Sequence, residues 1–349
     1  MARLRRADCS GPGIGRRRRG RGWEYFDDDG DKVSDPEDLA RISELAIPPA
    51  WRDVWICPDP QGHLQATGVD AAGRKQYLYH PRWRERRDQR KFDSMLEFAQ
   101  ALPAMRRRVA RDLEREGMER ERVLGCAVRL LDLGFFRVGG EDYAAENETY
   151  GLATIHRSHV TVGNGYVEFD YTAKSGARHL RSIVDDDVYE VVSRLKRRRG
   201  GHPELLAYKD GRRWVDVKSG DINVYIKEVT GGDFSAKDFR TWNATVLAAV
   251  GLAVSGPVRP SKNARKRAVT RAIKEVAHYL GNTPAVCRAS YIDPRVFDRY
   301  RSGWTIEPVL ANMAERSEAR EPSLQGAVEE AVLDLISEPN ESLVVEKVA

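Results

Sequence analysis

The sequence contains little that would point to a metalloprotein, a nucleotide hydrolase or a secreted protein. Its four cysteines form no Cys-x-x-Cys pair and have no histidines at zinc-ligand spacing, which indicates reduced thiols in a cytosolic protein. There is no Walker A loop and no carboxylate cluster suited to Mg²⁺. The longest mostly apolar stretch, residues 244–254, is too short to cross a bilayer, and no apolar run of a signal peptide follows the basic N-terminus.

Charged residues, in contrast, are abundant. The 58 Lys+Arg and 53 Asp+Glu give a formal net charge of +5, which is too small to identify a partner by itself. The acids cluster at residues 26–38 and near the C-terminus, so the middle of the chain is more basic than the total. This distribution favours a polyanionic partner.

The first part of the chain is predicted to be a basic arm followed by a small β-rich domain. Residues 1–22, with four successive arginines, are expected to be disordered, either as a solvated tail or as an extra contact to phosphate. Residues 23–90 alternate short strand-like segments with turn sequences. The expected strands are 23–26, 54–57, 63–68 and 76–79.

The rest of the chain is predicted to form a larger, mainly helical domain at residues 91–310, with a tail at 311–349. The turn sequence Asn164-Gly165 predicts a hairpin, and a third strand at 178–184 completes a three-stranded β unit. The class is therefore α+β. The helices predicted for this domain lie at 123–131, 185–199, 219–230, 238–254, 262–280 and 284–290. In the tail, an amphipathic segment at 324–336 is expected to pack on the surface.

Five polar residues stand at the expected ends of these elements: Arg137, Lys174, Arg240, Asn282 and Tyr291. Transfer of a phosphodiester to a protein side chain needs such a set. A tyrosine, with ~0.1% phenolate at neutral pH, would attack the phosphorus. Arginines would hold the phosphate oxygens, and a lysine or a histidine would protonate the departing oxygen. Spacing alone does not select these residues among 58 Lys+Arg and 13 tyrosines, most of which are expected to be surface or core residues.

Four blocks of sequence resemble one known family. They are FRVG and ENETYGLAT at 136–139 and 146–154, KDFRTW at 237–242, GNTP and SY at 281–284 and 290–291, and GVD and GRKQYLYH at 68–70 and 73–80. Poxvirus-type and bacterial type IB DNA topoisomerases carry similar blocks, which follow one another along the chain in the same order as here. The blocks span roughly residues 23–300, so the resemblance covers most of the chain.

The resemblance implies a role for each site residue. Tyr291 would form a 3′-phosphotyrosine and leave a 5′-hydroxyl, while Arg137 and Arg240 hold the phosphate oxygens. Lys174 would be the general acid. Asn282 stands where many relatives carry histidine, so it would donate one uncharged hydrogen bond. The residues of the front domain that would contact DNA are Arg74, Lys75, Gln76, Tyr77 and Tyr79.

The resemblance also implies a monomer whose two domains clamp duplex DNA in the bacterial cytoplasm, at the nucleoid, without a membrane, cofactor, metal or ATP. The same residues are also compatible with two other functions. A tyrosine recombinase uses a similar Arg–Lys–Arg–Tyr set, but as a multimer on paired sites, and the blocks at 68–80 and 146–154 favour a topoisomerase. A non-enzymatic DNA-binding protein would use the basic arm and would not need Tyr291.

Overall fold

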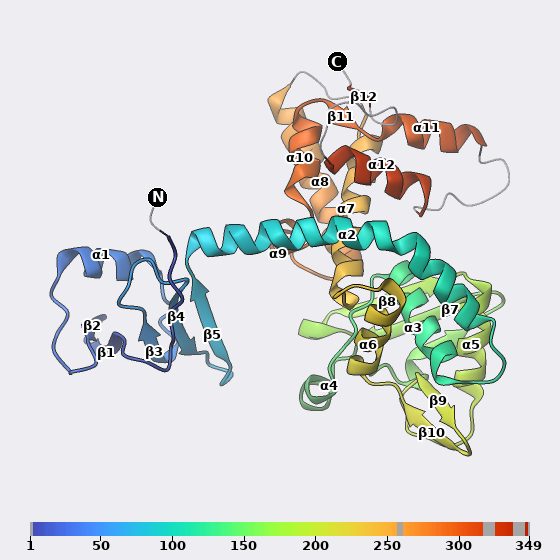
Figure 1. Cartoon of the computed structure of the whole chain (residues 1–349), viewed down its shortest axis with the longest axis horizontal. Helices are drawn as coiled ribbons and strands as arrows, with labels where there is room; N and C mark the ends of the chain where they lie inside the picture. The colour runs from blue at the N-terminus through green and yellow to red at the C-terminus, as the bar shows by residue number, and fades with distance from the viewer. Residues whose placement is uncertain (1–2, 257–260, 317–324, 338–345, 348–349) are drawn as a thin grey trace. The chain divides into compact units, whose positions relative to one another are not determined.

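The structure consists of small β-sheets and a large helical body, which confirms the predicted α+β class (Figure 1). The computed structural model describes residues 3–256, 261–316, 325–337 and 346–347. The chain divides into two compact units, Met1–Lys91 (unit 1) and Phe92–Ala349 (unit 2). In the described ranges, no helix combines the length and the apolar character needed to span a membrane.

Unit 1 contains a hairpin, a helix and a three-stranded antiparallel sheet. The hairpin pairs β1 (Gly15–Arg19) with β2 (Gly22–Phe26). The helix α1 (Pro36–Glu44) begins after Asp35, whose carboxylate accepts a hydrogen bond from the backbone of Glu37. The four strands predicted for this domain are confirmed. The sheet has the order β3 (Arg52–Ile56), β4 (Leu64–Val69) and β5 (Lys75–Tyr79).

The disorder predicted for residues 1–22 is wrong for the arginine-rich part, which forms strand β1. Arg16 donates to two loop carbonyls at 2.7 and 2.9 Å, and its guanidinium lies 4.0 Å from the ring centre of Trp23. Arg17 lies 4.6 Å from the ring centre of Phe26. The positive charges are thus stabilised by aromatic rings and carbonyl groups of the folded unit, which a run of arginines in the sequence does not reveal.

Unit 2 is mainly helical around one antiparallel sheet, of order β6 (Val160–Val162), β7 (Val167–Thr172) and β8 (Arg178–Ile183). The predicted hairpin is confirmed, and Gly165 in its turn has a φ of 83°. A second hairpin, which was not predicted, pairs β9 (Ala207–Asp210) with β10 (Arg213–Asp216).

The helices predicted for this unit are also confirmed. The helix α2 (Pro81–Leu113) begins in unit 1 and continues into unit 2. The other helices of unit 2 are α3 (Arg120–Gly134), α4 (Glu141–Asn147), α5 (Asp186–Arg197), α6 (Ser219–Thr230), α7 (Ala236–Val254), α8 (Lys262–Leu280), α9 (Pro284–Ser290), α10 (Pro294–Arg301), α11 (Glu307–Arg316) and α12 (Ala327–Ile336). Short 3₁₀ turns, η1 (Arg157–His159) and η2 (Lys174–Gly176), and the two-residue strands β11 (Trp304–Thr305) and β12 (Glu346–Lys347) complete it.

The segment expected to form a C-terminal tail at 311–349 includes α12, which is part of the core of unit 2. Arg106 of α2 pairs with Asp132 of α3 at 2.8 Å and with Glu329 of α12 at 2.5 Å. The indole N–H of Trp242 in α7 also donates to Glu329, at 2.8 Å. Residues 317–324, 338–345 and 348–349 of the expected tail lie outside the described part. The buried apolar residues of α12 are Val328, Ala331, Val332, Leu335 and Ile336.

A close approach of two backbone segments fixes the loop after α3. The helix ends at Gly134, and the next residue, Phe135, has a left-handed φ of 56°. Further along, the backbone N–H of Leu152 donates to the carbonyl of Arg137 at 2.8 Å. A Cβ atom on Gly151 would lie only 2.4 Å from the Cα of Gly139 and 2.9 Å from the carbonyl oxygen of Arg137. Only glycine fits at this crossing, and the crossing sets the position of Arg137.

We therefore expect Gly151→Ala to lower the free energy of unfolding by about 1–3 kcal/mol, because backbone atoms must move apart. The corresponding fall in Tm is roughly 2–10 °C, measurable by circular dichroism. Gly220→Ala is the matched control, since a Cβ atom on that glycine of α6 meets nothing within 4 Å. Equal melting temperatures for the two variants would contradict the close approach.

Candidate active site

A groove of about 1200 Å³ in unit 2 is lined by all five residues that were predicted to form a reactive site. They come from separate elements: the loop after α3, the turn between β7 and β8, helix α7, the connection from α8 to α9, and the end of α9. The structure therefore brings together Arg137, Lys174, Arg240, Asn282 and Tyr291.

The guanidinium groups of the two arginines bind the carbonyl ends of helices α3 and α8. Arg240, which is 3% exposed, donates to the carbonyl of Phe135 at 2.5 Å and to that of Leu280 at 2.9 Å. Arg137 donates to the carbonyl of Gly281 at 2.8 Å. The last carbonyls of a helix have no partner within the helix and carry partial negative charge. The ends of α3 and α8 therefore hold two guanidinium groups close to each other before any substrate binds.

The buried guanidinium of Arg240 keeps its charge and faces the tyrosine. Burial, together with the neighbouring charge of Arg137, lowers the pKa of Arg240 to about 10, so it remains protonated at neutral pH. Its guanidinium lies over the ring of Tyr291, 5.3 Å from the ring centre. Its Nε atom is buried and has no hydrogen-bond partner in the described part of the chain. A cationic donor is thus available next to the hydroxyl.

Of the two polar atoms in the side-chain amide of Asn282, one has a hydrogen-bond partner among the described residues and the other has none. Its Oδ1 accepts a hydrogen bond from Arg137 at 2.6 Å, while its Nδ2 is buried and has no acceptor among the described residues. The end of α8 is closed by backbone atoms, since the N–H of Asn282 donates to the carbonyl of Ala277 at 3.0 Å. The side chain is therefore not needed as a helix cap, and its N–H₂ group can donate to an incoming oxygen.

The backbone at Tyr291 is fixed from several directions. Its N–H donates to the carbonyl of Cys287 at 2.9 Å, and its carbonyl accepts from the hydroxyl of Thr245 in α7 at 3.4 Å. The next residue, Ile292, is fully buried. The tyrosine ring is partly buried against the core. These contacts limit the positions that the hydroxyl can take.

The lysine lies on a tight turn at the rim of the groove. Lys174 begins the 3₁₀ turn η2, and its side chain is exposed. The turn is closed by a hydrogen bond from the N–H of Ala173 to the carbonyl of Ala177, at 2.8 Å. A long cationic side chain at such a place can reach across the groove.

One residue of the groove was missed in the sequence. His179 of β8 is 5% exposed, and its Nδ1 lies 2.7 Å from the hydroxyl of Tyr171. Burial, and then the charges of Arg181, Arg137 and Arg240, lower the pKa of His179 to about 3. It is therefore a neutral imidazole at physiological pH. The sequence signal that could have marked His179 as a residue of the groove is its position on the strand that follows the Lys174 turn.

Of the five residues of unit 1 that were predicted to contact DNA, four lie in the edge strand β5 and Arg74 directly precedes it. Tyr77 is 45% exposed, and its ring stacks on that of Tyr79 with centres 6.1 Å apart. Gln76 and Arg74 are instead bonded to Asp70, each at 2.9 Å. Alternation along the strand places three of the predicted side chains on one face: Lys75, Tyr77 and Tyr79.

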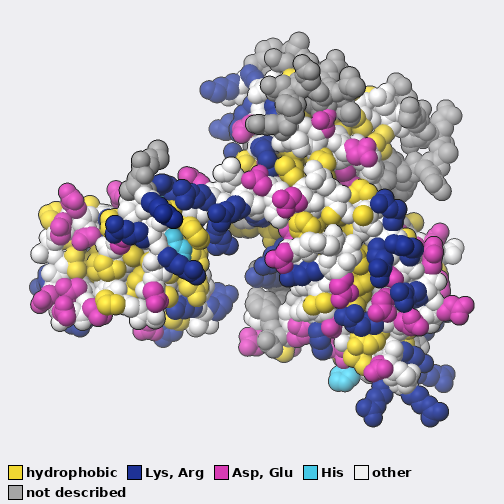
Figure 2. Space-filling model, viewed as in Figure 1, with side chains coloured by type: hydrophobic (Ala, Val, Ile, Leu, Met, Phe, Trp, Pro, Cys, Tyr) yellow, Lys and Arg dark blue, Asp and Glu magenta, His cyan; other side chains and the backbone are white. Residues whose placement is uncertain are grey.

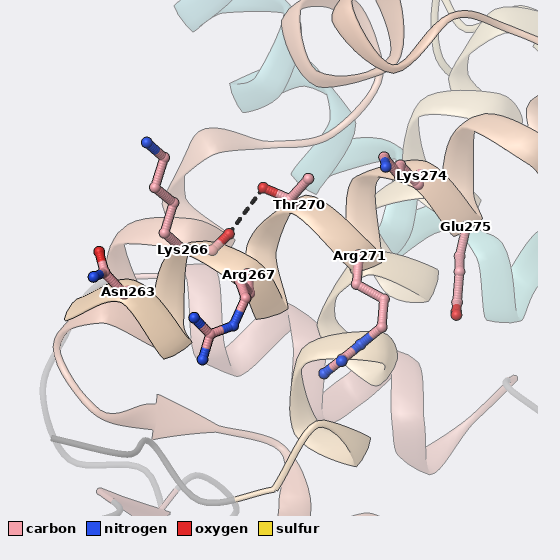
Figure 3. A pocket seen from close by; sticks show the side chains of 7 residues that line it. All are labelled: Asn263, Lys266, Arg267, Thr270, Arg271, Lys274 and Glu275. Carbon is pink, nitrogen blue, oxygen red and sulfur yellow. Dashed lines mark hydrogen bonds between the residues drawn. The ribbon is translucent and has the colours of Figure 1, made fainter. Parts of the chain in front are cut away.

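A second hollow, of about 510 Å³, follows one face of α8 (Figure 3). Thr270, in its middle, donates to the carbonyl of Lys266 at 2.9 Å. On the face drawn in Figure 2, Lys and Arg side chains are mixed with Asp and Glu. No described residue that lines the α8 hollow is a tyrosine, so the groove with Tyr291 remains the candidate site. The basic residues of the hollow are Lys266, Arg267, Arg271 and Lys274.

Comparisons with known proteins identify the class to which this fold and site belong. The family model for the catalytic core of eukaryotic DNA topoisomerase I matches residues 80–318, and the model for the N-terminal domain of bacterial DNA topoisomerase IB matches residues 22–70. The chain therefore belongs to the type IB DNA topoisomerase family. It is a DNA topoisomerase, an isomerase whose substrate is DNA.

Individual relatives agree with this assignment. The chain is 30% identical to DNA topoisomerase 1B of Acanthamoeba polyphaga mimivirus over 297 residues, which are 83% of this chain and 88% of the relative. It is 23% identical to DNA topoisomerase 1 of rabbit fibroma virus over 66% of this chain and 70% of the relative. The match to DNA topoisomerase 1 of Schizosaccharomyces pombe is 27% identical and spans 19% of that protein.

The neutral state of His179 makes stability depend on pH. Between about pH 3 and 6.5 the unfolded chain binds a proton at this histidine and the folded chain does not, so the free energy of unfolding falls as the pH falls. His179→Gln should reduce the slope of the free energy of unfolding against pH by up to about 1.4 kcal/mol per pH unit. The slope is measured by urea unfolding from pH 4.5 to 6.5. Tyr171→Phe keeps the histidine and should keep the slope. If the free energies of unfolding of the wild type and of His179→Gln change with pH in the same way, His179 is not the neutral buried group.

Proposed function

We propose that this topoisomerase relaxes supercoiled DNA by cutting one strand with Tyr291. The tyrosine oxygen attacks the phosphorus, the bond to the 5′ oxygen breaks, and the phosphate stays on the tyrosine as a 3′-phosphotyrosine. The 5′-hydroxyl later attacks the same phosphorus and restores the DNA strand. The observation that carries this proposal is the position of the buried cation Arg240, whose guanidinium lies 5.3 Å from the ring centre of Tyr291. A guanidinium at this place can stabilise the negative charge that develops on the reacting oxygens.

Three side chains are proposed to hold the phosphate. Arg137 and Arg240 supply positive charge, and Asn282 supplies an uncharged N–H. The buried Nδ2 of Asn282 and the Nε of Arg240 have no acceptor among the described residues, and a phosphate oxygen is the type of atom that would satisfy them. Since charge on the non-bridging oxygens grows in the transition state, donors fixed in advance lower the barrier.

Lys174 is proposed as the general acid. The departing 5′ oxygen leaves as a hydroxyl only if a proton is delivered to it, and a lysine at the rim of the groove can deliver one. In the rejoining step the same amine takes the proton back. The phosphodiester energy is kept in the phosphotyrosine bond, so neither ATP nor a metal ion is needed for the cycle.

The DNA surface of unit 1 is proposed to be the face of β5. Tyr77 and Tyr79 offer aromatic surface and hydroxyl groups, and Lys75 offers charge. Arg74 and Gln76 are oriented by Asp70 and would contact the same DNA. We further propose that the protein acts as a monomer at the bacterial nucleoid. A tyrosine recombinase would need several copies bound to paired sites, so the dependence of the rate on protein concentration separates the two.

The first test is relaxation of supercoiled plasmid in EDTA without ATP. The wild type should relax the plasmid, with a rate that rises linearly with protein concentration. Tyr291→Phe should bind DNA but give neither relaxation nor the covalent adduct that detergent traps, because a phenyl ring has no nucleophilic oxygen. Tyr279→Phe, which alters an exposed tyrosine of α8, is the matched control and should stay active. Relaxation by Tyr291→Phe, or a strict need for ATP or Mg²⁺, would overturn the mechanism.

The second test concerns the donor role of Asn282. Asn282→Ala should slow single-turnover cleavage by about 10²-fold or less, the low end for loss of one donor to an oxyanion, because two arginines share the charge. Asn282→Asp is the sharper variant. It keeps the oxygen that accepts from Arg137 but replaces the N–H₂ group with a second oxygen, which repels phosphate.

The two variants therefore distinguish donation from positioning. If Asn282 only orients Arg137, Asn282→Asp should cleave at nearly the wild-type rate, and that result would refute the donor role. Asn282→His should recover activity, because an imidazole N–H can occupy the same place, and it should add a pH dependence. The melting temperature of each variant is measured alongside, so that loss of folding is not mistaken for loss of chemistry.

A further inference from the structure

We propose that unit 2 carries a binding site for a divalent transition-metal ion, with Zn²⁺ preferred, formed by His202, Glu204 and Asp216. One candidate ligand atom from each residue lies within 4.8 Å of the others. The Nδ1 atom of His202 is 3.8 Å from an oxygen of Asp216. These residues belong to the loop before β9 and to the end of β10, and none of the three lines the groove that contains Tyr291.

Two buried carboxylate oxygens at this place have no donor. The side chain of Asp216 is 10% exposed, and its Oδ1 has no hydrogen-bond partner within the described ranges. The same holds for Oε2 of Glu204. Buried polar atoms are nearly always paired, and a buried ionised oxygen without a donor is especially costly. The arrangement thus lacks a positive group, which a cation bound between the two carboxylates would supply.

The nearest buried cation does not fill this gap. Arg198 directs its guanidinium to backbone carbonyls, those of His202 at 3.2 Å, Leu205 at 2.5 Å and also Glu204. No described hydrogen bond or ion pair joins this arginine to the carboxylate of Glu204 or Asp216. The role of Arg198 is to hold the loop that carries two of the three ligands.

The backbone around the ligands is fixed, so little must be ordered when an ion binds. The N–H of Leu205 donates to the carbonyl of Ile155 at 2.7 Å, and Asp216 pairs with Ala207 across the β9–β10 hairpin. Gly201, with a φ of 74°, directs the chain into the loop. The side chain of His202 is 76% exposed, so it can rotate to bring its nitrogen closer.

The chemistry of the ligands selects the ion. Imidazole nitrogen suits Zn²⁺ and its neighbours in the first transition row, whereas Ca²⁺ and Mg²⁺ prefer oxygen ligands in larger number. Zinc binds nitrogen and carboxylate oxygen at about 2.0–2.2 Å, which needs ligand atoms roughly 3.5 Å apart. Rotation of the exposed His202 is the main adjustment required. One imidazole and two carboxylates would leave the fourth position to water.

The test uses the full chain, stripped of metal with EDTA and dialysed, in calorimetric titration with ZnCl₂ and in thermal unfolding. We expect one tight Zn²⁺ per chain and a rise in Tm of roughly 5–10 °C at a hundredfold excess over Kd. MgCl₂ and CaCl₂ should give no comparable shift. His202→Ala and Asp216→Asn should weaken binding about tenfold or more. The matched control is Asp210→Asn, which removes the same charge from an exposed position of the same hairpin and should bind as the wild type does.

Absence of Zn²⁺ binding by the wild type would overturn the proposal, and so would equal binding by His202→Ala. The exposed His202 keeps the test decisive if Asp216→Asn does not fold. The experiments can refute the proposed metal site without refuting the proposed strand-cutting mechanism, and the reverse. His202→Ala should relax plasmid in EDTA at the wild-type rate, because the ion is proposed to stabilise the hairpin and takes no part in the chemistry.

Discussion

The bonds from Arg137 and Arg240 to the carbonyl ends of α3 and α8 are the constraint on which the reactive groove depends. Two guanidinium groups placed near each other repel, and the burial of Arg240 adds to the cost. The partial negative charge at two helix ends offsets both effects. Formation of the helical core therefore also forms the proposed phosphate site, whose cations would need no rearrangement when DNA arrives.

A large part of this architecture could be predicted from local sequence. The Asn164-Gly165 turn, the Asp185 cap of α5 and the apolar spacing of α7 are local features, and each specifies its element without help from distant residues. The five site residues could be placed at the ends of elements for the same reason. Their assembly into one groove could not be derived, because it depends on how helices pack, and only the family resemblance selected Tyr291 among 13 tyrosines.

The features that were missed all depend on distant partners. The arginine run at the N-terminus is ordered by rings and carbonyls, such as the ring of Trp23 near Arg16, so its charge pattern alone suggested a solvated arm. His179 is buried because Tyr171 of the neighbouring strand and the distant Phe136 pack around it, and the sequence near it does not show the contact with Phe136. His202, Glu204 and Asp216 form no known metal motif, since a hairpin brings the third residue back to the first two.

The network of Arg106, Asp132 and Glu329 has a consequence for how the protein is made. The ion pair between Arg106 and Glu329 joins residues 223 positions apart, and α12 emerges from the ribosome long after α2 and α3. Until then Trp242 lacks the acceptor of its indole N–H, and the apolar core that α12 covers is open to water. Unit 1, whose contacts are local, can fold during synthesis. Unit 2 closes its core only when α12 arrives, so the core stays incomplete until this last of its described helices has been made.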